Sequence, residues 1–191
     1  MGRPQKISDA ELLAACERAI GRWGPSFTLA QVAAEAGVAT STVATRFGSK
    51  HALLSAMLEF DADALINRMR DAADRQDDPV AAIQAAALVT ATGVDDPDTT
   101  ANHLGQLAKD LSDERLRIGL AALRATYRKE LARLLSVADL PGAPVPDVAA
   151  RVLAALVHGA QVDWALAPDG HLMAQLRADT AAVLDAWRRP R

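Results

Sequence analysis

The segment TSTVATRF, residues 40–47, combines hydroxyl groups with one guanidinium group and has few large apolar side chains. Hydroxyl groups donate and accept hydrogen bonds, and a guanidinium group can hold a phosphate or the edge of a guanine through two parallel hydrogen bonds. Val43 and Phe47 are four residues apart, as on one face of a helix. The segment is therefore suited to contact a nucleic acid on one side while these two side chains anchor the other.

Two capping boxes predict the helices that must position this segment. Ser8 and Thr28 each precede a Glu or Gln by three residues, which is the capping-box pattern. We expect one helix over about residues 9–22 and a second that starts at Leu29 and stops at Gly37, where glycine tolerates a left-handed turn. The inward stripe of the first helix comprises Leu12, Leu13, Cys16, Ala19 and Ile20. The polar third helix after this turn completes a helix-turn-helix pattern.

Residues 7–58 resemble the N-terminal domain of the tetracycline-repressor (TetR) family. A first helix is followed by T-x-x-x-[VI]-A-x-x-A-G-V, by a short helix ending in Phe, and by G-S-K and A-L-L. The matching residues are Thr28, Val32, Ala33, Ala36, Gly37, Val38, Phe47, Ser49, Lys50, Ala52, Leu53 and Leu54. The resemblance implies an all-α protein with a helix-turn-helix DNA-binding domain at residues 1–50. It also implies a helical ligand-binding and dimerisation domain at residues 51–191, and a repressor that a ligand releases from DNA.

The resemblance assigns DNA contacts residue by residue. Thr28 and Lys50 are placed to hold phosphates, and Arg3 and Lys6 on the N-terminal arm could enter a minor groove or touch phosphate. The candidates for base edges and backbone are Thr40, Ser41, Thr42, Thr45 and Arg46. Among them, Arg46 is the best candidate for reading sequence because it can bind guanine through two hydrogen bonds.

The recognition segment departs from the family pattern at three positions. Ala39 stands where the family often has Ser, and Ala44 and Arg46 replace an aromatic pair. The operator sequence therefore cannot be transferred from relatives. A second interpretation stays open: a small-molecule-binding or interaction module that keeps the fold but has lost specific DNA binding.

The distribution of charge is compatible with a DNA-binding N-terminus. Residues 1–50 carry six Lys and Arg against four Asp and Glu, a balance of +2, whereas the whole chain carries −3 and residues 51–191 therefore carry −5. A basic module on an acidic body is typical of a DNA reader with a separate regulatory domain.

The remainder of the chain predicts further helices. Ser112 is expected to cap a long helix that reaches about Val137. The helices expected at 147–166 and 171–188 are apolar enough to be buried, so we expect a homodimer through residues 147–188. The side chains that could line the pocket of an unknown small-molecule effector are Met57, Phe60, Leu88, His103, Leu107, Leu123, Tyr127 and Trp164.

Several classes of protein lack support. The single Cys16 excludes an intrachain disulfide framework, and His103, His158 and His171 lack the close helical spacing of a metal site, so we expect neither metal nor cofactor. No apolar run reaches the length of a membrane span, which favours a cytoplasmic protein. Without a Gly-rich phosphate loop, a G-x-S-x-G elbow or an activated Cys–His pair, we expect no enzymatic activity.

Overall fold

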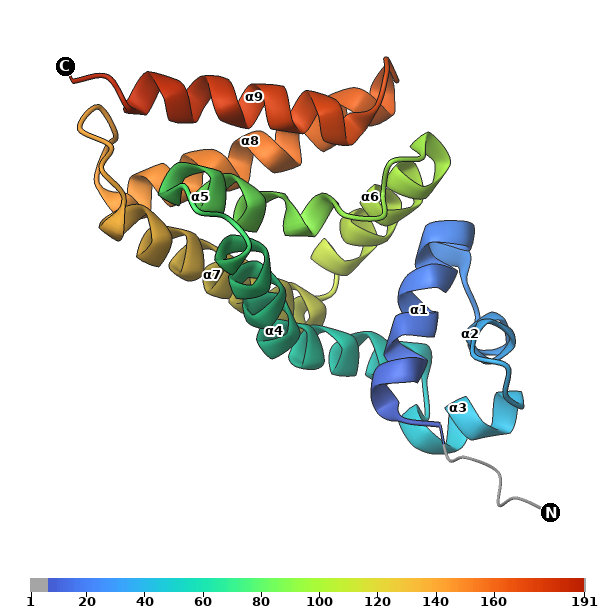
Figure 1. The fold of residues 1–191 in the computed structure, drawn as a ribbon. Helices are drawn as coiled ribbons and strands as arrows, with labels where there is room; N and C mark the ends of the chain where they lie inside the picture. The colour runs from blue at the N-terminus through green and yellow to red at the C-terminus, as the bar shows by residue number, and fades with distance from the viewer. Residues whose placement is uncertain (1–6, 191) are drawn as a thin grey trace. The chain divides into compact units, whose positions relative to one another are not determined.

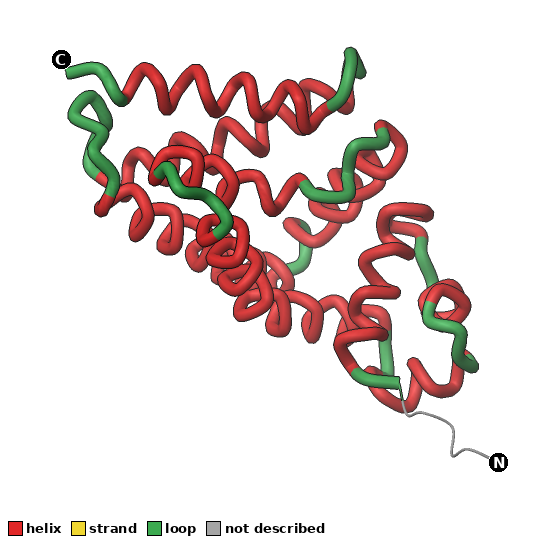
Figure 2. The backbone as a smooth tube through the Cα atoms, viewed as in Figure 1, coloured by secondary structure: helices red, strands yellow, loops and turns green. Residues whose placement is uncertain are grey.

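The computed structural model describes residues 7–190. This range folds into nine α-helices and two short 3₁₀ helices and contains no strand (Figures 1 and 2). The predicted all-α fold class is confirmed. None of the helices in this range is both long and apolar enough to cross a membrane.

Packing divides the described residues into two compact units. Unit 1 comprises residues 7–60 and 101–120, and unit 2 comprises residues 61–100 and 121–190. The helix α4, Lys50–Asp74, contributes residues to both. The expected domain boundary after residue 50 stays a prediction, but unit 1 also takes in the start of α4 and a segment from the middle of the chain.

The first three helices of unit 1 begin and end where local chemistry places them. They are α1 (Asp9–Trp23), α2 (Leu29–Glu35) and α3 (Thr40–Phe47), drawn in blue to cyan in Figure 1. A 3₁₀ turn, η1, Gly24–Ser26, follows α1. Both predicted capping boxes are present: the hydroxyls of Ser8 and Thr28 accept the N–H groups of Glu11 and Gln31.

The core of unit 1 packs α1 against α2 and α2 against α3. The predicted inward stripe of α1 is buried, and Phe27, Val32 and Val43 are 1%, 0% and 0% exposed. Gly37 adopts φ 66°, the left-handed conformation predicted for the turn, and the Val38 N–H donates to the carbonyl of Ala33 at 2.9 Å. These contacts fix the angle at which α3 leaves the turn.

The helix α6, Pro97–Leu111, is not among the helices predicted from the sequence. Asp96 in fact starts the helix, since its carboxylate accepts the Thr99 N–H at 2.8 Å. The expectation that Ser112 caps the next helix, α7, Glu114–Val137, was wrong. The cap is Asp113, whose carboxylate accepts the Leu116 N–H at 3.0 Å, while the Ser112 hydroxyl donates back to Ala108.

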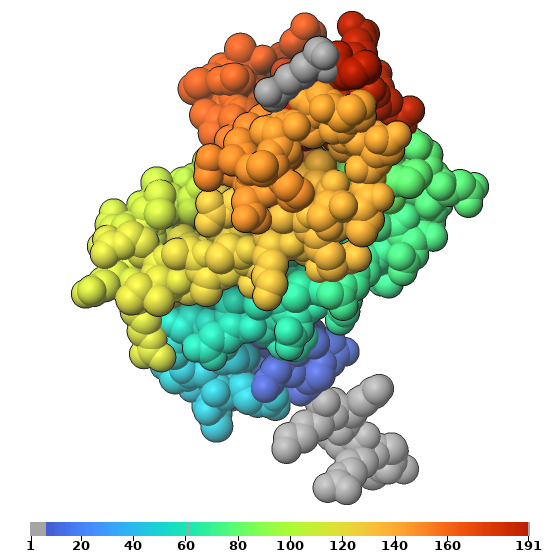
Figure 3. Space-filling model, turned by 90° about the vertical axis from the view of Figure 1, so that its left-hand side faces the viewer, coloured from blue at the N-terminus to red at the C-terminus, as the bar shows by residue number. Residues whose placement is uncertain are grey.

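Unit 2 is a helical bundle with its own hydrophobic core. Besides parts of α4 and α7, it contains α5 (Pro79–Leu88), η2 (Val89–Ala91), α8 (Pro146–Leu166) and α9 (Leu172–Trp187). The two last helices lie side by side, orange and red in Figures 1 and 3. The fully buried side chains of this core include Met69, Ile83, Leu131, Leu153, Leu172 and Leu176.

Candidate nucleic-acid interface

The helix α3 presents its polar face to a hollow on the surface of unit 1. Val43 is fully buried beneath the helix, whereas Thr40, Ser41 and Thr45 are exposed. The hollow has a volume of about 700 Å³ and is lined by Ile7, Ser41, Thr42, Thr45 and Arg46. Four of the residues predicted to contact DNA thus lie around one concave surface, and Thr40 lies on the same helix.

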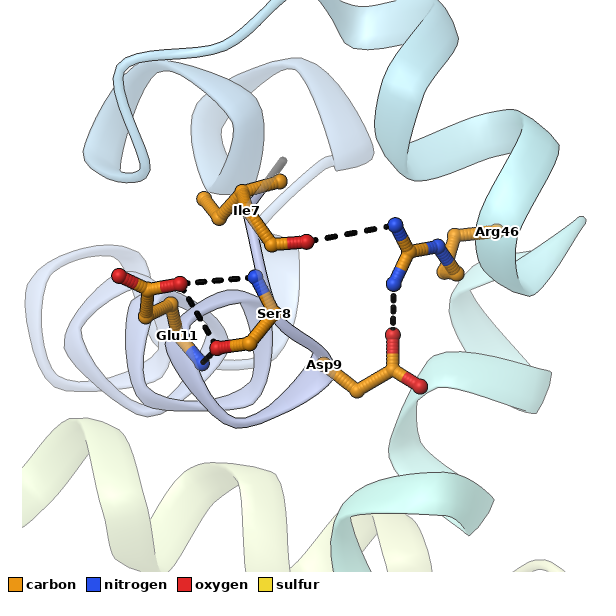
Figure 4. A network of polar contacts seen from close by, with 5 residues as sticks. All are labelled: Ile7, Ser8, Asp9, Glu11 and Arg46. Atoms are coloured by element: carbon orange, nitrogen blue, oxygen red, sulfur yellow. Dashed lines mark hydrogen bonds and ion pairs between the residues drawn. The ribbon is translucent and has the colours of Figure 1, made fainter. Parts of the chain in front are cut away.

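Arg46 is held by the start of α1 (Figure 4). Its Nη1 atom is hydrogen-bonded and ion-paired to the carboxylate of Asp9, and its Nη2 atom donates to the carbonyl oxygen of Ile7 at 3.3 Å. The Arg46 side chain is 29% exposed and that of Asp9 is 58% exposed. The guanidinium group is therefore accessible to solvent but already has two acceptors within the protein.

Lys50 occupies a different environment from the one expected of a phosphate contact. Its Nζ atom donates to the carbonyl oxygens of Pro25 at 2.8 Å and Phe27 at 2.7 Å, and lies 3.7 Å from the centroid of the Phe27 ring. Burial lowers the pKa of this amine below its usual value, with a further contribution from nearby Lys109. Lys50 thus ties the start of α4 to the segment between α1 and α2, and its phosphate contact stays a prediction.

Thr28 likewise makes an internal contact. Its hydroxyl accepts the Gln31 N–H at 3.3 Å and lies 3.1 Å from Gln31 Oε1, to which it can donate. The Thr28 N–H in turn donates to the Gln31 side-chain oxygen Oε1 at 2.8 Å, so these backbone N–H groups at the start of α2 are satisfied from within. Thr28 is thus the N-cap of α2, and its phosphate contact stays a prediction.

The remaining cations of the described N-terminal segment are also paired. Glu35 binds Arg18 at 3.4 Å and Arg22 at 3.2 Å. With Arg46 and Lys50 engaged as above, all four Lys and Arg side chains between residues 7 and 50 have acceptors within the protein. Arg3 and Lys6, predicted to reach DNA from the N-terminal arm, lie outside the described residues.

Sequence reasoning missed a set of polar contacts that join α6 and α7 to the rest of unit 1. Asn102 donates from Nδ2 to the carbonyl oxygen of Gly21, and His51 Nε2 lies 3.2 Å from the carboxylate of Asp113. Asp110 is 6% exposed and accepts the Gln106 side-chain amide at 2.6 Å; burial raises the pKa of Asp110. No sequence signal pointed to these pairs, because α6 itself had not been predicted.

The residues predicted to line an effector pocket are distributed over both units. Met57, Phe60, His103 and Leu107 lie in unit 1, whereas Leu88, Leu123, Tyr127 and Trp164 lie in unit 2. Leu88, Tyr127 and Trp164 belong to the core of unit 2, and Leu123 packs against it. The Tyr127 hydroxyl donates to the Ala87 carbonyl at 2.5 Å, whereas the buried Trp164 Nε1 has no hydrogen-bond partner among the described residues.

Comparison with known families identifies the N-terminal segment. Residues 12–57, which run from α1 into α4, match the family described as "Bacterial regulatory proteins, tetR family". These residues form a TetR-type N-terminal domain. This match covers the helix-turn-helix, so α3 occupies the position of the recognition helix in a TetR-type DNA-binding domain. No curated protein matches the sequence.

Solved structures of TetR-family and other transcriptional regulators share the fold over nearly the whole chain. A TetR transcription regulator from Haloarcula marismortui has a TM-score of 0.71 at 19% identity, covering 94% of this chain and 97% of the other. A TetR transcriptional regulator from Streptomyces coelicolor has a TM-score of 0.66 at 23% identity, covering 96% and 99%. The regulator FadR from Bacillus subtilis, solved in complex with stearoyl-CoA, has a TM-score of 0.67 at 16% identity, covering 94% and 99%.

Proposed function

We propose that this protein is a ligand-responsive transcriptional regulator that binds a palindromic operator as a dimer and acts as a repressor. The observation that carries the proposal is the polar face of α3, where Ser41, Thr42, Thr45 and Arg46 surround a hollow of about 700 Å³. Hydroxyl and guanidinium groups on a recognition helix are the groups that read base edges and hold phosphates. The TetR-type match over residues 12–57 supports this assignment.

The exposed face of α8 supports the dimer. A stripe of apolar and small residues follows a heptad spacing and consists of Val148, Val152, Ala155, Gly159, Val162 and Leu166. Val152 is 40% and Leu166 is 79% exposed, and a methyl group added at Gly159 would meet no atom within 4 Å. A helix with an apolar heptad stripe is stable when a second helix covers it. We therefore assign this stripe to the dimer interface within residues 147–188.

A two-fold dimer constrains the DNA site. Two copies of α3 related by a two-fold axis meet half-sites that are inverted copies of each other, separated by one DNA turn, about 34–36 Å, or a multiple of it. This geometry is the reason for proposing a palindromic operator. The same symmetry doubles every contact that one subunit makes.

For the effector, the core of unit 2 is the preferred place. Leu88, Leu123 and Tyr127 supply apolar surface. The Nε1 of buried Trp164, which has no hydrogen-bond partner within residues 7–190, supplies a donor. An effector that inserts there and accepts this hydrogen bond would be largely apolar. The structurally similar FadR of Bacillus subtilis, which was crystallised with stearoyl-CoA, gives a precedent for a ligand with a long apolar part.

A binding module without specific DNA recognition is the second candidate. It is favoured by Ala39 and Ala44 in the recognition segment and by the internal pairing of Arg18, Arg22 and Arg46. Such a module would bind all DNA weakly and alike, because only phosphates would contribute to binding.

Fluorescence anisotropy distinguishes the two functions. The purified protein is titrated against the DNA upstream of its own gene, against a scrambled duplex, and against a site selected from random sequence. The regulator binds one natural or selected site at least about a thousandfold more tightly than scrambled DNA, and Arg46→Ala weakens that binding. Arg128→Ala, which removes an exposed arginine from α7, is the matched control. Equal, weak binding to every duplex would contradict the proposal.

A further inference from the structure

The Asp9 carboxylate and the Ile7 carbonyl engage both terminal nitrogens of Arg46, which form one of the edges through which a guanidinium group can read a base. A guanidinium group reads guanine through two N–H groups on one edge. In this structure Nη1 contacts the Asp9 carboxylate and Nη2 contacts the Ile7 carbonyl, so both terminal nitrogens point toward the start of α1 (Figure 4). DNA can use this edge only by displacing these two acceptors.

Asp9 is held in position by the local structure of α1. It is the first residue of the helix, directly after the N-cap Ser8, whose hydroxyl and N–H both bond to Glu11. The capping box fixes the backbone from which Asp9 projects. Its side chain is 58% exposed, so water and DNA can reach the ion pair and open it.

We propose that Asp9 is a specificity-determining residue, which competes with DNA for the Arg46 guanidinium group. The inference rests on the proposed function, in which α3 reads DNA. DNA must replace the Asp9 carboxylate as the partner of Arg46 before the terminal nitrogens of Arg46 can contribute to binding. A cognate base edge offers two aligned acceptors to this guanidinium, together with the hydroxyl contacts of Ser41 and Thr45 around it. Non-cognate DNA offers only phosphate contacts and replaces the ion pair at little or no gain.

The expected effect follows from the exposure of the pair. Exposed ion pairs are weak, so their loss corresponds to about a two- to fivefold change in affinity per subunit, or about four- to 25-fold for a dimer. Asp9→Asn releases Arg46 and should tighten binding to random-sequence DNA by that factor. Binding to the cognate site should tighten less, because the cognate base already displaces Asp9. The ratio of specific to non-specific affinity therefore falls.

A double-mutant cycle separates this competition from simple charge repulsion. The affinity of the wild type, Asp9→Asn, Arg46→Gln and the double variant for a random-sequence duplex is measured by anisotropy over a range of salt concentrations. We expect Asp9→Asn to tighten binding and to steepen the log–log salt dependence by up to about two for a dimer. In the Arg46→Gln background, Asp9→Asn should leave the affinity for the duplex unchanged, because there is then no guanidinium group that Asp9 could keep from DNA.

Two results would overturn the proposal. One is an equal gain from Asp9→Asn in both backgrounds, which would show that Asp9 only repels phosphate; the other is no gain in either. Glu59→Gln, which removes an exposed carboxylate elsewhere in unit 1, controls for net charge, and circular dichroism checks that each variant is folded. Because the cycle is measured on a random-sequence duplex, it can be carried out without knowing an operator. If wild type shows no preferred site, the proposed function fails while this cycle still decides the role of Asp9.

Discussion

Asn102 in α6 donates a hydrogen bond from Nδ2 to the backbone carbonyl of Gly21 in α1, with a distance of 2.8 Å. A few residues further along, a methyl group added at Gly105 would lie 3.3 Å from the ring of Pro25, directly after α1. Around these two residues, α6 therefore contacts the end of α1 and the turn η1 that follows it. A displacement of this part of α6 would act first on the end of α1.

We expect Asn102→Ala to destabilise unit 1. The substitution leaves the Gly21 carbonyl, which lies in a buried residue, without this donor, and such a loss costs about 1 kcal/mol of unfolding free energy. Urea unfolding followed by circular dichroism measures the change. Asn67→Ala, at an exposed position on α4, is the matched control and should be nearly neutral. Equal stability of the two variants would show that the Asn102 hydrogen bond contributes little.

Replacing Lys50 by Met should affect stability more than DNA binding. Met keeps an apolar side chain of similar length but leaves the carbonyls of Pro25 and Phe27 without the amine, a loss of about 1–3 kcal/mol in unfolding free energy. The salt dependence of DNA affinity separates the two roles of Lys50, because an unchanged log–log slope would leave it with the structural role alone. If the log–log slope instead became shallower by about two for a dimer, Lys50 would be a phosphate contact after all. Lys129→Met, at an exposed lysine on α7, serves as control.

Unit 2 should lose stability at high pH, where the buried hydroxyl of Tyr127 loses its proton. Burial raises the pKa of Tyr127 from 10.0 to about 12, so the folded protein keeps the proton that the unfolded chain releases. The stabilisation is complete below pH 10 and is lost as pH rises to about 12, with a limiting slope of about 1.4 kcal/mol per pH unit. Tyr127 is the single tyrosine of the chain, so the ultraviolet absorbance of tyrosinate reports its pKa directly. Titration near pH 10 in the folded protein would contradict this environment.

The α8 stripe can be tested with one pair of variants. Val152→Glu places a carboxylate in the proposed interface and should convert the dimer to a monomer, because an unpaired buried charge is costly. Val137→Glu makes the same change at a valine that is 75% exposed and lies outside the stripe, and should leave the dimer intact. Analytical ultracentrifugation gives both masses. A dimer that survives Val152→Glu would place the interface elsewhere.

Local patterns predicted the helix-turn-helix well because its signals are short in range. Ser8 and Thr28 cap helices through residues only three positions away, and Gly37 ends α2 by its own backbone conformation. The helix α6 was missed because its start, Asp96, looks like a turn residue, and the same carboxylate chemistry serves turns and helix caps.

The partners of the cations could not be predicted from local patterns. Arg46 and Asp9 are separated by 37 residues, and Lys50 reaches carbonyls 23 and 25 residues earlier. Sequence analysis identifies a lysine or arginine but does not show which acceptors the fold brings to it. The phosphate contact of Lys50 stays a prediction, and the contacts of its amine with the carbonyls of Pro25 and Phe27 are what the sequence could not indicate.

The internal pairing of Arg18, Arg22, Arg46 and Lys50 also bears on how the proposed regulator finds its operator. A protein stays on random DNA mainly through cations that release counterions there. When the cations of the described reading domain are already engaged, each encounter with non-cognate sequence is brief. Such a regulator would search the chromosome by frequent detachment and three-dimensional diffusion, with little sliding along the duplex.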